Sequence, residues 1–417
     1  MADGLIELRL ALVSPFLDRL HGTERCIIEQ LERLAARDDV QIHVYSHRID
    51  DLSGAVPYRG SVSSARIFWH RVPSMPGPHL LAYVSWFVVN HLQRLWDSRI
   101  RGLNFDLLYS PGINTLDADA IAVHIVFHAF YDRIRERLKF RNAAIATWPR
   151  LLHRLLYYQL IMALERVIYR RRAVSLNSVS RLVACQLNKY FQRTDVTVIP
   201  NGVDTVQFSP QSRTELRASA RARFRLSPSD FTLLLIGNDW KKKGLDCLLE
   251  TMAAACVELG LKLLVVGSDQ RSEYEAAAGR FGLAERVFFL EPSSDVIQFY
   301  AAADAYVGPS LEDAYGLPVL EAMACGLPVI ASSRAGVSEI IAHWKNGMIL
   351  HNPQDSVELA KLLRELSSNP EMCQTIGREA ALTAGQQTWD RNAADLWEFL
   401  NQAAIKKSHA RVHATNG

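Results

Sequence analysis

Three consecutive lysines follow an apolar, strand-like run in the second half of the chain. Lys241, Lys242 and Lys243 come after residues 231–236, and Gly244 precedes an apolar helical pattern. Cations near the positive, N-terminal end of a helix are unfavourable unless an anion shares the site. Because open α/β sheets bind ligands at the carboxyl ends of their strands, this loop is a candidate anion site. The alternative is a run of solvated lysines with no ligand.

A second segment, residues 309–332, carries the pattern of a helix start that could face an anion. Its sequence is PSLEDAYGLPVLEAMACGLPVIAS. Gly316 would end a loop, Pro318 would occupy the first helical turn, and Gly326 would form a left-handed end. The backbone amides of Gly316 and Leu317 would then have no partner within the helix and could bind an anion.

Two carboxylates flank this helix start. Asp313 precedes the predicted helix, and Glu321 lies eight positions later, in its first turn or two. Side chains so placed could hold opposite ends of one polar ligand. The alternative for Glu321 is that it only complements the positive end of the helix dipole.

Several segments resemble the motifs of one enzyme family. Residues 316–330, with the spacing of the two acids, resemble the Glu-x7-Glu signature of retaining GT-B glycosyltransferases of family 4. Residues 201–208 are similar to that family's interdomain segment, 237–244 to its diphosphate loop and 336–341 to the motif after its last long strand. The resemblance is close over roughly residues 170–400 and loose before them. It implies an α/β fold of the GT-B type, with two Rossmann-like domains facing across a cleft.

The resemblance implies a role for each charged side chain of these segments. Lys242 and Lys243 match the basic pair that neutralises the diphosphate of a nucleotide-sugar donor, and Lys243 is expected to act in catalysis on this leaving group. Asp313 matches the first, catalytic acid, placed against the hydroxyls of the donor sugar. Glu321 matches the second acid, which holds the ribose hydroxyls.

The resemblance also places backbone contacts to the donor. The backbone at Tyr315, Gly316 and Leu317 would contact the sugar and the phosphates. The nucleotide base would lie near Leu290, in the segment 290–293.

Two residues depart from the family pattern. Asp313 is one methylene shorter than the usual Glu and has Glu312 beside it, so we expect an altered reach with function retained. Asn238 stands where an arginine is frequent, which leaves more of the phosphate charge to the lysine pair.

The first half of the chain offers fewer candidates. Gly22 and Thr23, between the first strand and its helix, would approach the donor phosphates or the acceptor, unless they form an ordinary strand–helix turn. His124 and His128 lie at the end of a predicted strand. In the resembling family a histidine at this place reaches the transferring sugar, and we favour His124 for that role. A structural histidine is the alternative for either one.

The elements that must position these residues alternate along the chain. Strands are predicted at residues 8–14, 41–46, 65–72, 106–110, 120–127, 173–178, 196–199, 231–236, 261–266, 287–290, 305–307, 328–331 and 347–350. Amphipathic helical patterns separate many of them, which indicates parallel sheets covered on both faces. There are too many such units for one small doubly wound sheet. An eight-stranded barrel is the alternative architecture.

A turn-rich joint at residues 198–210 favours two domains over a barrel. With the resemblance, it predicts an N-terminal Rossmann-like acceptor-binding domain at 1–198 and a C-terminal Rossmann-like donor-binding domain at 199–385. We expect residues 386–404 to form a helix that returns to the N-terminal domain. Residues 405–417 are predicted to be a disordered tail because they are polar.

Composition excludes several classes of protein. The chain has 417 residues, of which 49% are hydrophobic and 22% charged, which excludes disorder and fibrous repeats. Six dispersed cysteines without metal-ligand spacing favour a reducing compartment, and the start of the chain lacks a signal-peptide pattern. A net charge of +3 is too small to suggest nucleic acid as a partner. We therefore expect a cytoplasmic protein.

The basic residues are unevenly distributed. Residues 1–208 hold 26 Lys and Arg against 19 Asp and Glu, whereas residues 209–417 hold 21 against 25. Within the basic half, residues 148–172 mix Leu and Tyr with Arg at helical spacing. Such a helix could lie peripherally on the inner face of an anionic membrane, which would suit a lipid-linked acceptor. The alternative is a buried helix with a solvated basic face.

Together these features predict a retaining hexosyltransferase. Its substrates would be a UDP- or GDP-sugar and a hydroxyl of a glycan or lipid-linked acceptor. No cofactor or metal is expected, because the lysines would replace a divalent cation. The alternatives are another GT-B enzyme, such as an epimerase or an inverting transferase, and a catalytically silent partner that binds nucleotide sugars.

Overall fold

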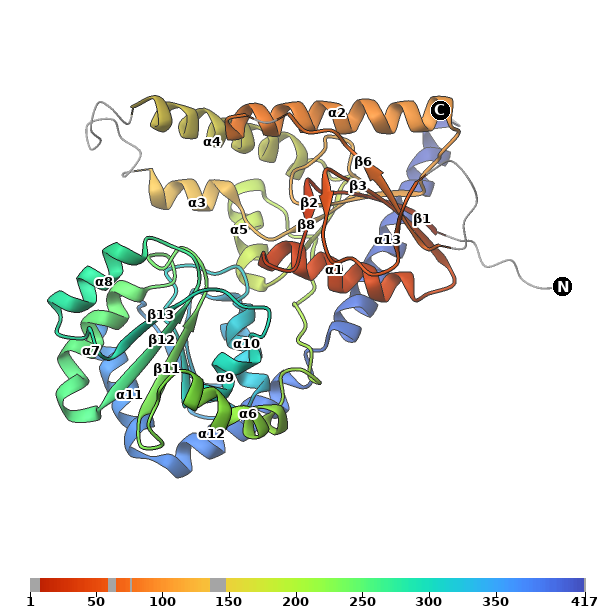
Figure 1. Cartoon of the computed structure of the whole chain (residues 1–417). Helices are drawn as coiled ribbons and strands as arrows, with labels where there is room; N and C mark the ends of the chain where they lie inside the picture. Colours follow the sequence, from red (N-terminus) through yellow and green to blue (C-terminus); the bar gives the residue numbers. More distant parts are fainter. Residues whose placement is uncertain (1–7, 59–64, 76, 136–147, 416–417) are drawn as a thin grey trace. The chain divides into compact units, whose positions relative to one another are not determined.

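The computed structural model describes residues 8–58, 65–75, 77–135 and 148–415. The chain divides into two compact units (Figure 1). The first contains Met1–Pro200 and Asp390–Gly417, and the second contains Asn201–Trp389. Each has its own parallel sheet and its own hydrophobic core.

The first unit is built on an eight-stranded sheet with the order β10-β9-β8-β7-β1-β3-β6-β5. Its strands are β1 (Leu8–Val13), β3 (Val40–Ser46), β5 (Ala55–Pro57), β6 (Ile67–Arg71), β7 (Leu107–Pro111), β8 (Ala120–Val123), β9 (Ser175–Ser178) and β10 (Val196–Val198). All described pairings are parallel. A separate two-stranded pair joins β2 (Phe16–Leu17) to β4 (Arg48–Ile49). The strand order reverses between β1 and β7, as in a doubly wound sheet.

Helices cover both faces of this sheet. They are α1 (Gly22–Ala35), α2 (His79–Ile100), α3 (Phe127–Ile134), α4 (Trp148–Tyr169), α5 (Arg181–Phe191) and most of α13 (Trp389–Thr415). Helices α1 and α13 share one core cluster with the strands, whereas Trp86 of α2 packs on the opposite face, against Val13 and Tyr45. Helices therefore bury the apolar strand residues on both faces of the sheet, as is usual for parallel sheets.

The second unit repeats the plan with a six-stranded parallel sheet in the order β13-β12-β11-β14-β15-β16. Its strands are β11 (Phe231–Ile236), β12 (Leu261–Val266), β13 (Val287–Leu290), β14 (Ala305–Gly308), β15 (Val329–Ser332) and β16 (Met348–Leu350). Its helices are α6 (Pro210–Arg223), α7 (Leu245–Leu259), α8 (Arg271–Arg280), α9 (Ile297–Ala302), α10 (Leu317–Ala324), α11 (Ser356–Ser368) and α12 (Pro370–Ala384), with the 3-10 helix η3 (Gly336–Ile340). The order reverses between β11 and β14.

The strand predicted at residues 120–127 is too long. Strand β8 ends at Val123, and α3 begins at Phe127. The backbone amides of Phe127 and His128 donate to the carboxylate of Glu165, at 2.7 and 3.0 Å, and these bonds satisfy the start of the helix. An apolar run does not by itself reveal where a strand gives way to a helix.

The disordered tail predicted at residues 405–417 is also wrong over residues 405–415, because α13 continues to Thr415; residues 416–417 lie outside the described residues. Two side chains fasten this part of the helix to the first unit. The Nζ atom of Lys406 donates to the carbonyl of Arg172, and that of Lys407 contacts the carboxylate of Asp119, each at 2.7 Å. A polar sequence is therefore ordered by contacts with residues far away in the chain.

Candidate functional site

In the second unit, the loops with the predicted site residues follow β11 and β14. These are the two neighbouring strands between which the strand order reverses. Open α/β sheets bind their ligands at such a switch point, outside the carboxyl ends of the strands. Residues 237–244 and 309–316 therefore meet where the topology places a ligand.

An ion pair joins the two loops. The Nζ atom of Lys243 donates to Oδ2 of Asp313 at 2.6 Å, and both side chains are about one-fifth exposed. Burial alone would raise the pKa of the Asp313 carboxyl, but the charges of Lys243 and Lys242 outweigh burial and lower this pKa below its usual value. Asp313 is therefore a carboxylate at neutral pH.

The lysine loop approaches its neighbours closely because it contains glycines. A Cβ atom on Gly237 would lie 2.5 Å from Cε of Lys243, and one on Gly244 would collide with the carbonyl oxygen of Pro309. Gly244 also has a φ of +81°, which side-chain-bearing residues rarely adopt. Lys241 is exposed, whereas Lys242 and Lys243 are half-buried. The loop thus turns two of its three lysines toward the protein.

The backbone fixes the position of Asp313. The Asp313 amide donates to the carbonyl of Arg334 at 3.1 Å, and the Asp313 carbonyl accepts from Gly336 at 3.1 Å. The amide of Leu311 donates to the carbonyl of Lys242 at 2.8 Å. The loop after β14 is therefore held between the lysine loop and the segment after β15.

The predicted helix start is present as α10. Its N-cap is Gly316, which has a left-handed φ of +98°, and Pro318 lies in the first turn. Gly326 follows the helix with a φ of +70°. The amides of Val319 and Leu320 donate to the carbonyl of Gly316, so the first helical hydrogen bonds begin there. The amides of Gly316 and Leu317 precede these bonds, at the positive end of the helix dipole.

Glu321 is buried inside the second unit. It is 3% exposed, and its Oε2 atom accepts a hydrogen bond from the hydroxyl of Tyr300 at 2.6 Å. Burial, together with Glu321, raises the pKa of Tyr300 well above its usual value, so the tyrosine remains protonated. A buried carboxylate held by a tyrosine is more than a surface complement to a helix dipole. No motif in the chain indicated Tyr300, because it lies on another helix, α9.

Two further predicted contacts lie at the same edge of the sheet. Tyr315 is 4% exposed, and its carbonyl accepts from Val337 at 2.7 Å. Leu290 ends β13, and its carbonyl accepts from Gly267 in the loop after β12 at 3.1 Å. Leu290 is thus two strands away from β11, on the side opposite to β14.

Trp240 is a residue of the lysine loop that the sequence analysis did not select. It is 1% exposed, and its indole Nε1 is buried with no hydrogen-bond partner among the described residues. Its backbone amide donates to the carboxylate of Asp269 at 2.6 Å. The side chain of Asn238 accepts from the amide of Ser268 at 2.8 Å, so the residue that replaces the frequent arginine instead ties the two loops together.

In the first unit, the two candidate histidines have different surroundings. His128 lies in α3, where its Nδ1 is 2.5 Å from Oε2 of the fully buried Glu165. His124 follows β8, and its Nδ1 is buried without a hydrogen-bond partner among the described residues. Burial lowers the pKa of His124 to about 4, so its ring is neutral at physiological pH. The ring of His128 is therefore held by a buried glutamate, and His124 remains the favoured candidate for ligand contact.

Gly22 and Thr23 form the first turn of α1. Gly22 is exposed, and a Cβ atom added there would meet open space. The N-cap residue, His21, makes no side-chain capping hydrogen bond. Its ring instead contacts the buried carboxylate of Asp18 at 2.9 Å, and this carboxylate also accepts from the backbone amides of Leu20 and His21. The structure therefore leaves both the ligand contact and the ordinary turn open for Gly22 and Thr23.

The two units, each a doubly wound parallel sheet with loops at its switch point, define a protein of two Rossmann-like domains. Two family models match the chain, one described as "Glycosyltransferase Family 4" over residues 20–207 and one as "Glycosyl transferases group 1" over residues 217–383. Together they cover most of the chain. The chain belongs to the GT-B glycosyltransferases of group 1 and family 4 type.

Curated relatives match over a part of their length. A D-inositol 3-phosphate glycosyltransferase of Segniliparus rotundus is 32% identical over 233 residues, which are 53% of this chain and 50% of that protein. One of Rhodococcus jostii is 29% identical over 227 residues, 51% of this chain and 49% of that protein. The chain spans about half the length of the curated relatives it matches.

Solved structures share the fold over nearly the whole chain. WaaG, a glycosyltransferase involved in lipopolysaccharide biosynthesis, has a TM-score of 0.74 at 20% identity, over 95% of this chain and 98% of its own. Anabaena HepE in complex with UDP and glucose has a TM-score of 0.65 at 18% identity, over 95% of this chain and 100% of its own. At such identities the likeness is one of fold.

Proposed function

We propose that this protein transfers a hexose from a nucleotide diphosphate sugar to a hydroxyl of a glycan or lipid-linked acceptor, with retention of the anomeric configuration. The observation that carries the proposal is the pair of Lys243 and Asp313 at the switch point of the second unit, 2.6 Å apart. A cation and an anion that share one site can bind the two charged or polar parts of such a donor. Lys243 would bind the diphosphate, and Asp313 would bind the sugar hydroxyls.

The catalytic role of these residues follows from where charge develops on the donor during sugar transfer. As the bond between the sugar and the phosphate breaks, positive charge grows on the sugar and negative charge on the departing diphosphate. Lys242, Lys243 and the amides of Gly316 and Leu317 are preorganised to stabilise this negative charge. Lys243 must give up or share its contact with Asp313 when the donor binds, so donor binding frees the carboxylate for the sugar.

The acidic residues of the second unit would bind the donor and would not attack the bond between its sugar and phosphate. Glu321 would hold the ribose hydroxyls, with Tyr300 fixing its orientation. No nucleophile is assigned to the protein, and the departing phosphate would take the proton of the acceptor hydroxyl. The lysines would do the work of a divalent cation, so no metal or other cofactor is required.

His124 would contact the transferring sugar in its neutral form. A neutral imidazole can donate one hydrogen bond to a hydroxyl without placing a positive charge beside an oxocarbenium-like sugar. The lowered pKa of His124, about 4, keeps this form dominant at neutral pH.

We propose that the acceptor is reached at the inner face of a membrane, through the basic segment 148–172. The arginines of this segment would attract anionic headgroups. No helix of the described residues is long and apolar enough to cross a bilayer, so this contact would be peripheral.

A thermal-shift titration with UDP, GDP, ADP and dTDP, each with and without EDTA, tests the donor site. UDP is the first candidate because the HepE structure contains it. A ligand that binds only the native state raises its stability by about 2.7 kcal/mol at one hundred times the Kd. We expect one nucleotide to give a selective shift that EDTA does not reduce. A shift that disappears with EDTA would contradict the metal-free site.

Lys243→Ala and Lys241→Ala form a matched pair for this titration. Lys243 faces Asp313, whereas Lys241 is exposed in the same loop. We expect Lys243→Ala to abolish the nucleotide shift and sugar transfer, and Lys241→Ala to retain most of both. Equal shifts in the two variants would disprove the assignment of Lys243 to the diphosphate.

A further inference from the structure

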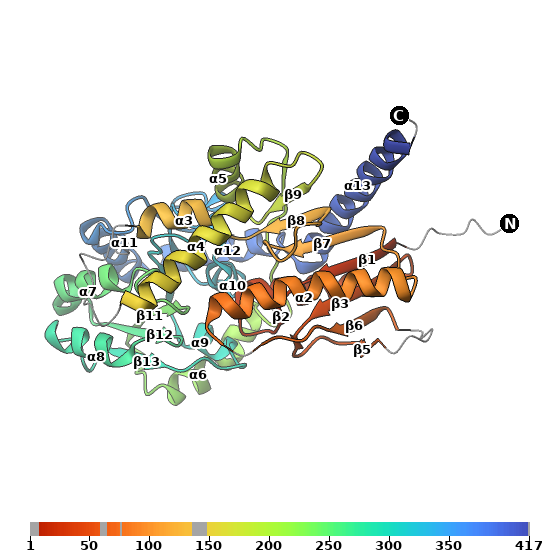
Figure 2. The ribbon, with the colours of Figure 1, turned by 90° about the horizontal axis from the view of Figure 1, so that it is seen from above.

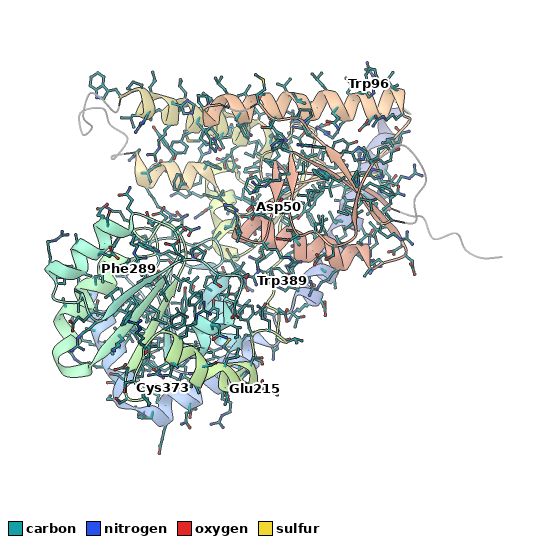
Figure 3. The ribbon with its side chains drawn as sticks, viewed as in Figure 1. Asp50, Trp96, Glu215, Phe289, Cys373 and Trp389 are labelled. Atoms are coloured by element: carbon teal, nitrogen blue, oxygen red, sulfur yellow. The ribbon has the colours of Figure 1, made fainter. Side chains whose placement is uncertain are left out.

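The outer face of α2 is apolar where a water-facing helix is normally polar. The outer face of α2 consists of the exposed side chains of Leu81, Val84, Val88, Leu92, Leu95 and Trp96. Leu81 is 63% exposed, and Leu92 and Trp96 are each 59% exposed. Figure 3 shows Trp96 pointing away from the rest of the first unit. Single exposed apolar residues are ordinary, but a continuous row along a helix indicates an interaction surface.

On the opposite, buried face of α2, three of the four buried residues are polar: Asn90, Arg94 and Asp97, beside Trp86. Arg94 forms hydrogen bonds at 2.7 and 2.9 Å with the carboxylate of Asp117, and one at 2.6 Å with Thr115. Asp97, which is 1% exposed, accepts from the hydroxyl of Tyr45 at 2.8 Å. These contacts fix the rotation of the helix about its axis. Turning the leucines inward would separate the buried guanidinium of Arg94 from Asp117, whose side chain is 56% exposed, so the apolar face is committed to the outside.

Helix α4 extends the apolar surface. Trp148, Leu152 and Leu156 are exposed in its first half, at four-residue spacing. The two helices lie next to one another along one side of the first unit (Figures 1 and 2). The rings of Tyr83 and Tyr157 pack edge to face between them, with centroids 5.8 Å apart. The outer faces of α2 and α4 are therefore parts of one surface.

The exposed charged residues of the two helices themselves have one sign. All residues of α2 and α4 are described, and their two acids, Asp97 and Glu165, are 1% and 0% exposed. The exposed charged residues within or directly after the two helices are Arg99, Arg101, Arg150, Arg154, Arg166 and Arg170, with Arg171 and Arg172 beyond them. An apolar surface bordered by arginines is complementary to an anionic bilayer, which offers acyl chains beneath negative headgroups.

We propose that the outer faces of α2 and α4 seat the first unit on an anionic lipid bilayer, with the apolar side chains at the boundary of headgroups and acyl chains. A second copy of the chain fits this surface less well. A two-fold interface would place these arginines near one another, and neither helix presents an exposed acid to pair with them. The proposal deepens the proposed function, on which it rests for the lipid-linked acceptor, and adds α2 to the basic segment as the part that enters the lipid.

Co-sedimentation of the full chain with vesicles tests the proposal. The vesicles consist of phosphatidylcholine alone or of phosphatidylcholine mixed with phosphatidylglycerol. We expect stronger binding to the mixed vesicles. Leu92→Gln with Trp96→Gln should lower the partition coefficient by roughly tenfold or more, because each change removes buried apolar area. The matched control is Val206→Gln with Leu382→Gln, two exposed apolar residues of the second unit, and should bind as the parent does.

The contribution of the arginines to lipid binding is tested separately. Arg150→Gln with Arg154→Gln should lower binding to the mixed vesicles by roughly thirtyfold, since each arginine near an anionic surface contributes about 1 kcal/mol. Binding to phosphatidylcholine alone should change little. An unchanged preference for the mixed vesicles would contradict the role of these arginines.

Three outcomes would overturn the proposal. These are no vesicle binding by the parent, equal binding by parent and Leu92→Gln/Trp96→Gln, and a dimer in sedimentation analysis that this double variant dissociates. The nucleotide thermal shift of each variant is measured alongside. Loss of lipid binding with the nucleotide shift intact would report on the surface alone, whereas a parent that binds lipid but no nucleotide would count against the transferase proposal instead.

Discussion

At the scale of single residues, the contact between Lys243 and Asp313 shows where the carboxylate of the shortened acid lies. The aspartate is one methylene shorter than the glutamate of the resembling family, yet its carboxylate lies 2.6 Å from the lysine because the backbone of its loop is held on both sides. The sequence identified both residues. It did not reveal that their side chains form an ion pair.

Asp313→Asn tests the charge of this carboxylate at nearly constant volume. We expect sugar transfer to fall by about a hundredfold or more, because the amide cannot stabilise the positive charge that develops on the sugar. Steady-state transfer with the nucleotide sugar identified by thermal shift measures the effect. Asp313→Glu, which restores the family residue, is the control and should retain much more activity. Full activity of the Asn variant would remove Asp313 from catalysis.

His124 gives a prediction about pH. Its pKa is about 4 in the folded protein and about 6.5 in the unfolded chain. Between these values the unfolded chain binds a proton that the native protein does not, so His124 lowers the stability as the pH falls from 6.5 toward 4. We therefore expect His124→Asn to gain stability relative to the parent between pH 7.5 and pH 5. Urea unfolding at the two pH values measures the difference, and a constant difference would contradict the lowered pKa.

At the scale of elements, the glycines of the lysine loop set how closely it approaches the loop after β14. Gly244→Ala would place a Cβ atom against the carbonyl of Pro309. We expect the free energy of unfolding to fall by about 2–4 kcal/mol, from the backbone strain and the collision together, and donor binding to weaken. Urea unfolding and the nucleotide thermal shift measure these effects.

Gly260→Ala is the matched control for this change. Gly260 also has a left-handed backbone, with a φ of +57°, but a Cβ atom there meets open space. Gly260→Ala should lower the free energy of unfolding only by the backbone strain, about 1–2 kcal/mol, and should leave donor binding unchanged. Equal losses in the two variants would show that the contact with Pro309 contributes nothing.

The same elements show what a sequence can and cannot predict. The strand–helix alternation and the glycines around α10 are local patterns, so the strands of both sheets and the helix start at Gly316 were predictable. The short strands β2, β4 and β5 were missed, because two or three residues carry no periodic signal. The contacts of Glu321 with Tyr300 and of His128 with Glu165 depend on packing between distant segments, and no spacing in the chain encodes them.

At the scale of the whole molecule, the first unit is built from both ends of the chain. Its last helix, α13, belongs mostly to the first unit, although the second unit precedes it in the chain. Leu396, Phe399 and Leu400 of α13 are part of the same core cluster as the strands of the first unit. The first unit is therefore completed only when the end of the chain is present, whereas the second unit has a core of its own.

This arrangement predicts that damage to α13 weakens one unit selectively. Phe399 is 5% exposed, and Phe399→Ala should destabilise the first unit by about 3–5 kcal/mol, since the cavity adds to the lost burial. Hydrogen exchange followed by mass spectrometry measures the stability of each unit separately, because amides exchange through the local opening of their own cooperative unit.

We expect Phe399→Ala to give faster exchange in β1, β3 and β7 and unchanged exchange in β11, β12 and β14. Leu363→Ala, in the core of the second unit, is the matched control and should give the reverse pattern. Faster exchange in both units from Phe399→Ala alone would mean that the two cores unfold together. The proposed nucleotide site, whose residues lie in the second unit, would then depend on a helix that lies mostly in the first unit.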